Sequence, residues 1–352
     1  MSKEYYASPR ISQSFLKNMY QGLGKIHKYE KMGERNYNLS LSDSTVIGSG
    51  VDCKITTPEY WDQEFIIWDK KKPSDSIIEV FSYLIEQEKL TDREIYPLLS
   101  FGRGITEYLE NVKYEGFGKS RGTYAKALAK LQEWEDYWFF LQKSQGKSIL
   151  DPQRLSTINH ATDVLQNHRF TKDIFEYKCE NQVWLELTYR GIEVKGLLDR
   201  VLINDTNQDH VFQNGLMIPA RSITVLDIKT GRYRPENVTK YMNEWRIDIQ
   251  LAFYNMLAKR NYYKDYYVNN PLIVYTQNST LTNYPVVKEL TNIELNVGQF
   301  GMKGESVLSS YSELSNDFSK YGFEQCIDIY KYYVENGRDI DWQVNMNNGL
   351  IN

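Results

Sequence analysis

The fold is decided by an apolar run that carries one internal acidic residue, Gly191-Ile192-Glu193-Val194-Lys195-Gly196-Leu197-Leu198-Asp199-Arg200-Val201-Leu202-Ile203. Its apolar and β-branched residues predict a β-strand in which Asp199 lies among buried neighbours. A second run predicts another strand that ends in two charges and breaks at Thr230-Gly231; it reads Ile223-Thr224-Val225-Leu226-Asp227-Ile228-Lys229. The polar, Asn-rich segment 204–220 between them suits a connection between antiparallel neighbours. We therefore expect Asp199 and Asp227 to lie side by side.

Side-chain alternation brings a carboxylate and an ammonium to one face of the second strand. Asp227 and Lys229 share that face, and Ile228 points to the other. Two converging buried carboxylates repel each other unless a cation lies between them. A hard divalent ion such as Mg2+ suits such a pair, and Lys229 could then act on an attacking water. Taken alone, the triplet favours an ordinary strand pair that ends in a salt bridge over a metal site.

The segment that follows, from Pro235 to about Arg260, has the periodicity of one amphipathic helix. Gln250 and Tyr254 stand one turn apart beside its apolar stripe. That stripe consists of Met242, Trp245, Ile249, Phe253 and Met256. By themselves the Gln and the Tyr also fit a plain buried polar pair.

Together, three motifs in this order resemble the core of the PD-(D/E)XK nuclease superfamily, in its RecB-like and phage-exonuclease branch; they are Gly196-x-x-Asp199, Asp227-Ile228-Lys229 and Gln250-x-x-x-Tyr254. The resemblance implies that Asp199, Asp227 and the Ile228 backbone carbonyl bind a metal ion, Mg2+ or Mn2+. It also implies that Lys229 acts on the water, and that the Gln/Tyr helix supports the site and contacts DNA. The chain departs from the family pattern with Asp in place of the commoner Glu at 227, and with Leu198 where the family name has Pro.

The same resemblance suggests two further acidic metal ligands. Asp52, in a predicted helix over 46–55, stands where the family has a metal-binding His, and a carboxylate is a competent ligand for Mg2+ or Mn2+. A solvated or capping Asp is the alternative. Glu180 matches a family Glu at the start of the predicted strand 180–189, although a Glu at a strand edge is usually solvated. The opening segment 11–17, Ile-Ser-Gln-Ser-Phe-Leu-Lys, also resembles the family.

Composition excludes several other kinds of site. The net charge of −4 gives no general attraction to nucleic acid, so DNA contacts must come from local cations or bound metal ions. Cys53, Cys179 and Cys326 are far apart, which argues against a disulfide framework and a zinc site and cannot supply a four-cysteine iron-sulfur cluster. The absence of a signal-like or membrane-length apolar run predicts a cytoplasmic protein with no membrane partner, in the host cell if the chain is phage-encoded.

We therefore expect an α/β fold with a restriction-endonuclease-like core, in which helices flank a central mixed β-sheet, and with an N-terminal helical elaboration. The expected organisation is a single nuclease domain over 1–352, with an N-terminal helical part at 1–170, a catalytic core at 171–280 and a C-terminal extension at 281–352. The resemblance implies a metal-dependent DNA exonuclease of phage-type recombination, replication or end processing. An endonuclease of the same superfamily and a catalytically inactive DNA-binding subunit are the alternatives.

The expected partners follow from the same resemblance. DNA is the first, and a single-strand annealing or recombination protein is a second candidate. A homo-oligomer stays open. Cations directly after the Asp-Ile-Lys strand are candidate contacts to DNA, with a solvated loop as the alternative reading; they are Arg232, Arg234 and Lys240.

Overall fold

The computed structural model describes residues 3–19, 42–87, 96–101, 104–105, 121–144, 146–262, 264–281, 284–302 and 321–336. The chain divides into two compact units, which are described separately. The first comprises Met1–Arg35, Ile47–Glu59 and Thr157–Asn352, and the second comprises Asn36–Val46 and Tyr60–Ser156. Helices α4 (Asp43–Thr56) and α10 (Pro152–Asn167) each contribute residues to both.

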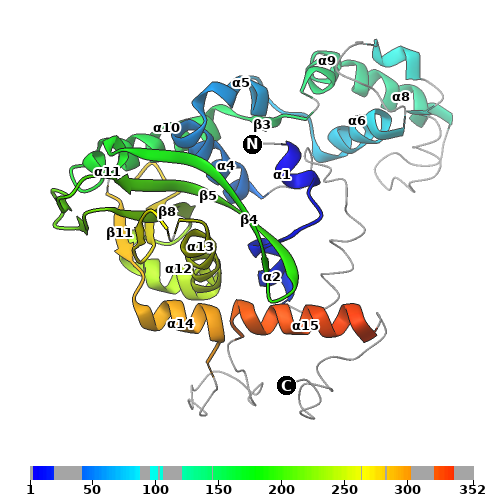
Figure 1. Cartoon of the computed structure of the whole chain (residues 1–352). Helices are drawn as coiled ribbons and strands as arrows, with labels where there is room; N and C mark the ends of the chain where they lie inside the picture. The colour runs from blue at the N-terminus through cyan, green and yellow to red at the C-terminus, as the bar shows by residue number, and fades with distance from the viewer. Residues whose placement is uncertain are drawn as a thin grey trace, which may run out of the picture. The chain divides into compact units, whose positions relative to one another are not determined.

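The first unit is built on a mixed β-sheet with strand order β1-β5-β8-β10-β11, in which β4 also pairs with β5 and β9 with β8. Neighbours are antiparallel in β4/β5, β5/β8 and β10/β11, and parallel in β1/β5, β8/β9 and β8/β10. The strands are β1 (Ile11–Ser12), β4 (Cys179–Tyr189), β5 (Ile192–Asn204), β8 (Ser222–Gly231), β9 (Tyr267–Val268), β10 (Leu272–Gln277) and β11 (Val286–Glu289). This sheet and its flanking helices confirm the expected α/β class (Figure 1).

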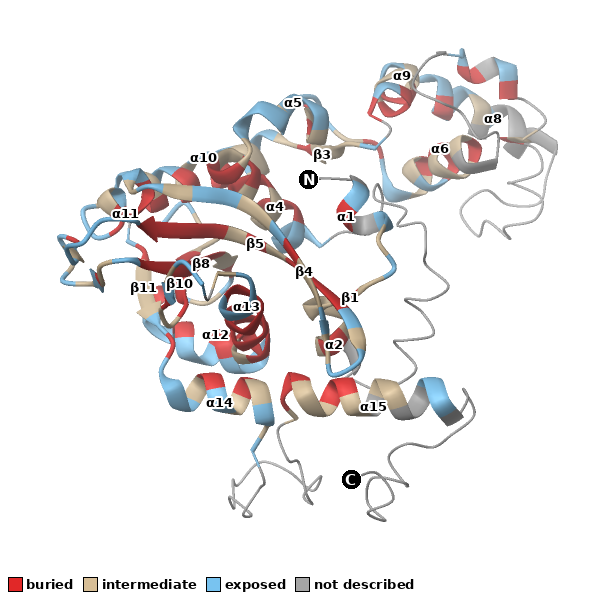
Figure 2. Cartoon of the chain, in the orientation of Figure 1, coloured by how far each residue is buried: buried red, intermediate tan, exposed pale blue. Residues whose placement is uncertain are grey.

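The two decisive strands form as the apolar runs predicted. β5 and β8 are joined by a polar segment that holds only a small hairpin of β6 (His210–Val211) and β7 (Met217–Ile218). β8 does not break at Thr230 but continues to Gly231, where a side chain would lie 2.9 Å from Tyr241 and from the Tyr275 hydroxyl. Both strands are largely buried (Figure 2).

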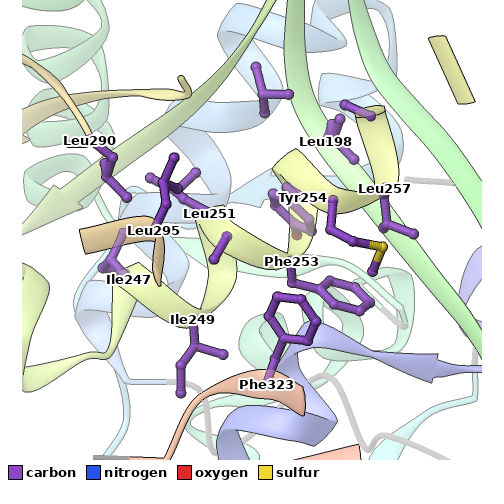
Figure 3. Close-up of a cluster of buried hydrophobic side chains, with 14 of the residues drawn as sticks. Leu198, Ile247, Ile249, Leu251, Phe253, Tyr254, Leu257, Leu290, Leu295 and Phe323 are labelled. Carbon is purple, nitrogen blue, oxygen red and sulfur yellow. The ribbon is translucent and has the colours of Figure 1, made fainter. Parts of the chain in front are cut away.

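Helix α13 (Ile247–Tyr262) packs on the sheet and is buried on nearly every side from Ile247 to Ala258. It lies between the sheet and the helices α14 (Asn292–Phe300) and α15 (Phe323–Asn336) (Figure 1). Figure 3 shows part of the resulting apolar core, in which the rings of Phe253 and Phe323 meet edge to face with centroids 5.5 Å apart. Besides parts of α4 and α10, the other helices described in this unit are α1 (Lys3–Ala7), α2 (Gln13–Met19), α11 (Lys172–Glu176), η3 (Pro235–Asn237) and α12 (Val238–Glu244).

The structure corrects the single helix expected over 235–260. The segment forms η3 and α12 and then, after a break at Trp245 and Arg246, forms α13. Arg246 has a φ of 47°, and its guanidinium bonds to Asp248 and to the backbone carbonyl of Tyr321. Because a distant backbone oxygen helps to hold this turn, helical periodicity alone could not reveal it. Trp245 is 51% exposed and does not belong to the apolar stripe.

The second unit is helical and has its own aromatic core. Trp138, fully buried on α9, packs against Phe81 and Phe101 with ring centroids 5.3 and 5.5 Å away. The buried amide of Gln142 bonds to both backbone groups of Tyr96, which fixes a loop against α9. The elements are η1 (Pro58–Tyr60, at the boundary), α5 (Trp61–Glu64), β2 (Phe65–Ile67), α6 (Asp75–Gln87), η2 (Leu98–Phe101), α8 (Arg121–Gln132), α9 (Glu135–Lys143) and β3 (Ser148–Leu150).

None of the helices in the described ranges combines the length and the apolar character that crossing a bilayer requires.

Candidate active site

The candidate site lies where two sheet strands separate. β5 and β8 pair from Asn204↔Ser222 as far as Arg200↔Leu226, and β1 then pairs with β5 at Val194 and Lys195. Residues 196–199 of β5 therefore have neither β8 nor β1 as a ladder partner. Asp199 occupies this interval, and one of its oxygens accepts a hydrogen bond of 2.9 Å from the backbone N–H of Ile228. The fork in the sheet thus leaves room for the polar side chains of two neighbouring strands.

Asp227 is the most deeply buried acid of the site, with no exposed surface. Its Oδ1 accepts hydrogen bonds of 2.8 Å from Lys229 Nζ and 2.8 Å from Gln250 Nε2. Its Oδ2 is buried and has no hydrogen-bond partner. An unpartnered buried carboxylate oxygen is costly, so a cation or a hydrogen-bond donor at this atom would be favourable.

The Lys229 ammonium lies between the acids. It is 2.8 Å from Asp227 Oδ1, 3.8 Å from Asp199 Oδ2 and 3.3 Å from the Ile228 carbonyl oxygen. Burial by itself lowers the pKa of Lys229, but the charges of Asp227 and Asp199 outweigh burial and raise it above its usual value. The ammonium therefore occupies the position in which a metal ion would contact the two carboxylates and the Ile228 carbonyl.

The carboxyl groups of Asp199 and Asp52 are both difficult to ionise. Burial, together with the charges of Asp227 and Asp52, raises the pKa of Asp199 well above its usual range despite the nearby Lys229. Burial and Asp227 likewise raise the pKa of Asp52 to about 6. The structure thus places Asp52, on α4, within electrostatic range of the pair on β5 and β8. The three carboxylates repel one another when they ionise, and a divalent cation would offset that repulsion.

The oxygen atoms of the site suit a hard divalent cation. Carboxylate and carbonyl oxygens are the ligands that Mg2+ and Mn2+ prefer, and Asp227 Oδ2 needs a partner. Across the described residues, however, no three His, Cys, Asp or Glu side chains are arranged to hold a metal ion as they stand. Lys229 Nζ lies among the oxygens instead. Because Mg2+ is commonly held by one or two carboxylates and keeps several waters, Asp199 and Asp227 fit such an ion if the Lys229 ammonium moves away from them.

Helix α13 reaches the site because Gly196 has no side chain. A Cβ at this position would lie 2.4 Å from Leu257 Cδ1 and 3.3 Å from the ring of Tyr254. The close approach lets Gln250, one turn before Tyr254, bond to Asp227. Tyr254 itself is buried, and burial raises the pKa of its hydroxyl well above its usual value. This explains in physical terms why a glycine, a Gln and a Tyr accompany the acids in the sequence.

The other residues predicted from the sequence lie at exposed positions. Glu180 is exposed, pairs in register with Val201 and accepts a hydrogen bond of 3.4 Å from the Tyr262 hydroxyl, so the structure does not bring it to the site. The cations after β8 are Arg232, Arg234 and Lys240, and all three are exposed. Their exposure fits both a surface that binds a ligand and a solvated loop. Arg232 is 2.9 Å from Glu244, which offsets part of its charge.

Two residues near the acids were not singled out from the sequence. Gln182 of β4 bonds to Asp52, and Lys17 of α2 lies within electrostatic range of Lys229, Asp227 and Asp248. Burial and the Lys229 charge lower the pKa of Lys17 to about 8. Lys17 falls within the opening segment that resembles the family, and this was the only signal in the sequence that could have indicated it.

Comparisons with known proteins leave the family open. No protein-family model matches the chain, and no curated protein matches it. Among solved structures, a protein of Eubacterium rectale named "Putative exonuclease" matches with 13% identity and a TM-score of 0.41, over 84% of this chain and 80% of that one. A likeness at that TM-score carries no argument about function, so the proposal below rests on the geometry of the site.

Proposed function

We propose that the protein is a metal-dependent deoxyribonuclease that hydrolyses phosphodiester bonds of DNA from its ends. The observation that carries this proposal is the unpartnered buried Oδ2 of Asp227, beside Asp199 and Lys229 at a fork in the sheet. Two acids with a lysine that contacts both are poorly explained as a stabilising element, because buried ion pairs that leave an oxygen unpaired cost free energy.

The cation would be held by Asp199, Asp227 and the Ile228 carbonyl, with Asp52 as a further ligand. When bound, a divalent cation supplies positive charge for the scissile phosphate and lowers the pKa of a water. Its binding would release Lys229 from Asp227, and the freed ammonium would then lie next to the attacking water. There it can donate a hydrogen bond that orients that water, and it can stabilise negative charge that develops on a phosphate oxygen.

Gln250 keeps Asp227 in position during this exchange. Its Nε2 donates to Oδ1, the same oxygen that Lys229 contacts, so Oδ1 retains a partner when the lysine leaves. Tyr254 packs against Gly196 and keeps α13 in register with β5. Both residues therefore support the acids, and a direct contact of either with DNA remains part of the proposal.

DNA binding would rely on local charge, since the chain carries a net charge of −4. The exposed cations after β8 follow the Asp-Ile-Lys strand directly and are the proposed contacts; they are Arg232, Arg234 and Lys240. A free DNA end that reaches the metal site would gain both these contacts and the cation. Internal loading on duplex by phosphate contacts alone would be weak, which favours an exonuclease over an endonuclease.

The test is digestion of end-labelled linear duplex and covalently closed circular DNA with Mg2+, with Mn2+ and with EDTA. The proposal predicts metal-dependent loss of the linear substrate from its ends, while closed circles persist. Rapid linearisation of circles would replace the exonuclease by an endonuclease. Absence of cleavage with either metal, on single-stranded as well as duplex DNA, would refute the nuclease itself.

A further inference from the structure

Gln182 occupies an unusual place in the sheet. β4 and β5 pair at Asn181↔Arg200 and at Val183↔Leu198, so Gln182 lies opposite Asp199 without a ladder pair of its own. Its φ is 50°, a left-handed backbone conformation that few residues other than glycine adopt. Strained residues of this kind persist where surrounding contacts hold them, and they are frequent at functional sites.

The side chain of Gln182 makes the contacts that hold it there. Its Nε2 lies 3.1 Å from Asp52 Oδ2, 3.4 Å from Asp52 Oδ1 and 3.0 Å from the Thr56 hydroxyl. Thr56 in turn donates to the backbone carbonyl of Asp52 at 2.8 Å. One amide therefore ties the Asp52 carboxylate and the next turn of α4 to the strand that faces Asp199.

α4 itself is fixed by close packing on either side of this contact. A Cβ on Gly50 would lie 2.5 Å from Ile158 Cδ1, and one on Gly48 would lie 3.5 Å from the hydroxyl oxygen of Thr230. The backbone of α4 is thus set against its neighbours. The orientation of the Asp52 carboxylate then depends on the donors that it meets, and the Gln182 amide is the one supplied by the sheet.

We propose that Gln182 is a positioning residue that holds the Asp52 carboxylate toward the cation site of Asp199 and Asp227. The inference rests on the proposed function, since it concerns the same cation. A neutral amide suits this task because it donates to Asp52 without adding a fourth negative charge beside Asp199 and Asp227. Hydrogen bonds to metal ligands typically change metal affinity by about 10- to 100-fold when they are removed.

Three substitutions of Gln182 distinguish the effect of its amide donor from the effects of its backbone conformation and of side-chain charge. Gln182→Met keeps the length but loses the donor, so Mn2+ affinity should fall by about tenfold or more. Gln182→Asn suits the left-handed backbone but is one methylene too short to reach Asp52, so affinity should fall while the metal-free protein keeps its stability. Gln182→Glu adds a carboxylate, so the metal-free protein should lose stability while Mn2+ binds more tightly.

The measurement is a titration of the full-length protein with Mn2+, in which free Mn2+ is followed by electron paramagnetic resonance and thermal unfolding is recorded alongside. Gln208→Met makes the same chemical change in an exposed loop and should leave Mn2+ affinity unchanged. If the wild type binds no Mn2+, the proposed function fails. If the wild type binds and Gln182→Met binds equally well, or if Met and Glu shift the affinity in the same direction, the role of Gln182 is refuted while the cation site stands.

Discussion

Replacing Gly196 by alanine should destabilise the protein through one identifiable collision. The added methyl would lie 2.4 Å from Leu257 Cδ1 and 3.3 Å from two ring carbons of Tyr254, whereas ordinary contacts between such atoms begin near 3.4 Å. Leu257 is fully buried, so its side chain must shift by about 1 Å in a packed core. Overpacking of this kind costs about 1–3 kcal/mol in the free energy of unfolding. The shift also moves α13 away from β5 and lengthens the bond between Gln250 and Asp227.

The assay is equilibrium urea unfolding of a double-mutant cycle. Leu257→Ala alone should cost about 2–5 kcal/mol, because it leaves a cavity. The double variant should cost less than the sum of the two, by about 1–2 kcal/mol, since the new methyl fills part of that cavity. Gly215→Ala is the matched control: Gly215 has a φ of 84° and no atom within 4 Å of an added Cβ, so its cost comes from the backbone and should add to that of Leu257→Ala. A Gly196→Ala protein of wild-type stability, or full additivity with Leu257→Ala, would refute the close approach.

Three further predictions concern charge. Because the pKa of Lys17 is lowered to about 8 from 10.5, its charge opposes folding at pH 7, and this penalty fades as pH rises from about 8 to 10.5. Lys17→Met should therefore unfold at a higher temperature than wild type at pH 7, by a margin that shrinks by pH 10; an equal margin at both pH values would contradict it. Calorimetry should find weak Mg2+ binding without DNA and tighter binding with it, since phosphate oxygens complete the coordination; a tight site without DNA would contradict this. In steady-state assays, neutralising the cations after β8 (Arg232, Arg234 and Lys240) should raise the DNA concentration for half-maximal rate more than it lowers the maximal rate. A larger effect on the maximal rate would exclude them as DNA contacts.

The sequence predicted the centre of the fold because local patterns determine it. The apolar runs around Asp199 and Asp227 form adjacent antiparallel strands, and side-chain alternation brings Lys229 to Asp227. Gln250 reaches Asp227 from the helix that was expected to support the acids. These contacts follow from strand pairing, from a period of two residues and from a glycine that permits close packing.

Features that depend on distant parts of the chain were not predictable in this way. The break at Arg246 is held partly by a backbone carbonyl at Tyr321, and β1 pairs with β5 across more than half of the chain. Gln182 has a left-handed backbone and its side chain contacts Asp52, while Glu180, two residues earlier, stays exposed. A single left-handed residue in a strand can redirect its side chain, and nothing in the composition of 180–189 marks such a residue.

The most direct test of the central claim is the initial rate of Mn2+-dependent DNA cleavage by wild-type protein and by Asp199→Ala, Asp227→Ala and Lys229→Ala, with binding of the same DNA measured in Ca2+. Each variant should cleave at least about a hundredfold more slowly, because each removes either a cation ligand or the group that acts on the water. Lys229→Ala should still bind DNA in Ca2+, which would separate lost chemistry from lost folding. Wild-type turnover in any of the three folded variants would show that these residues are not the catalytic site.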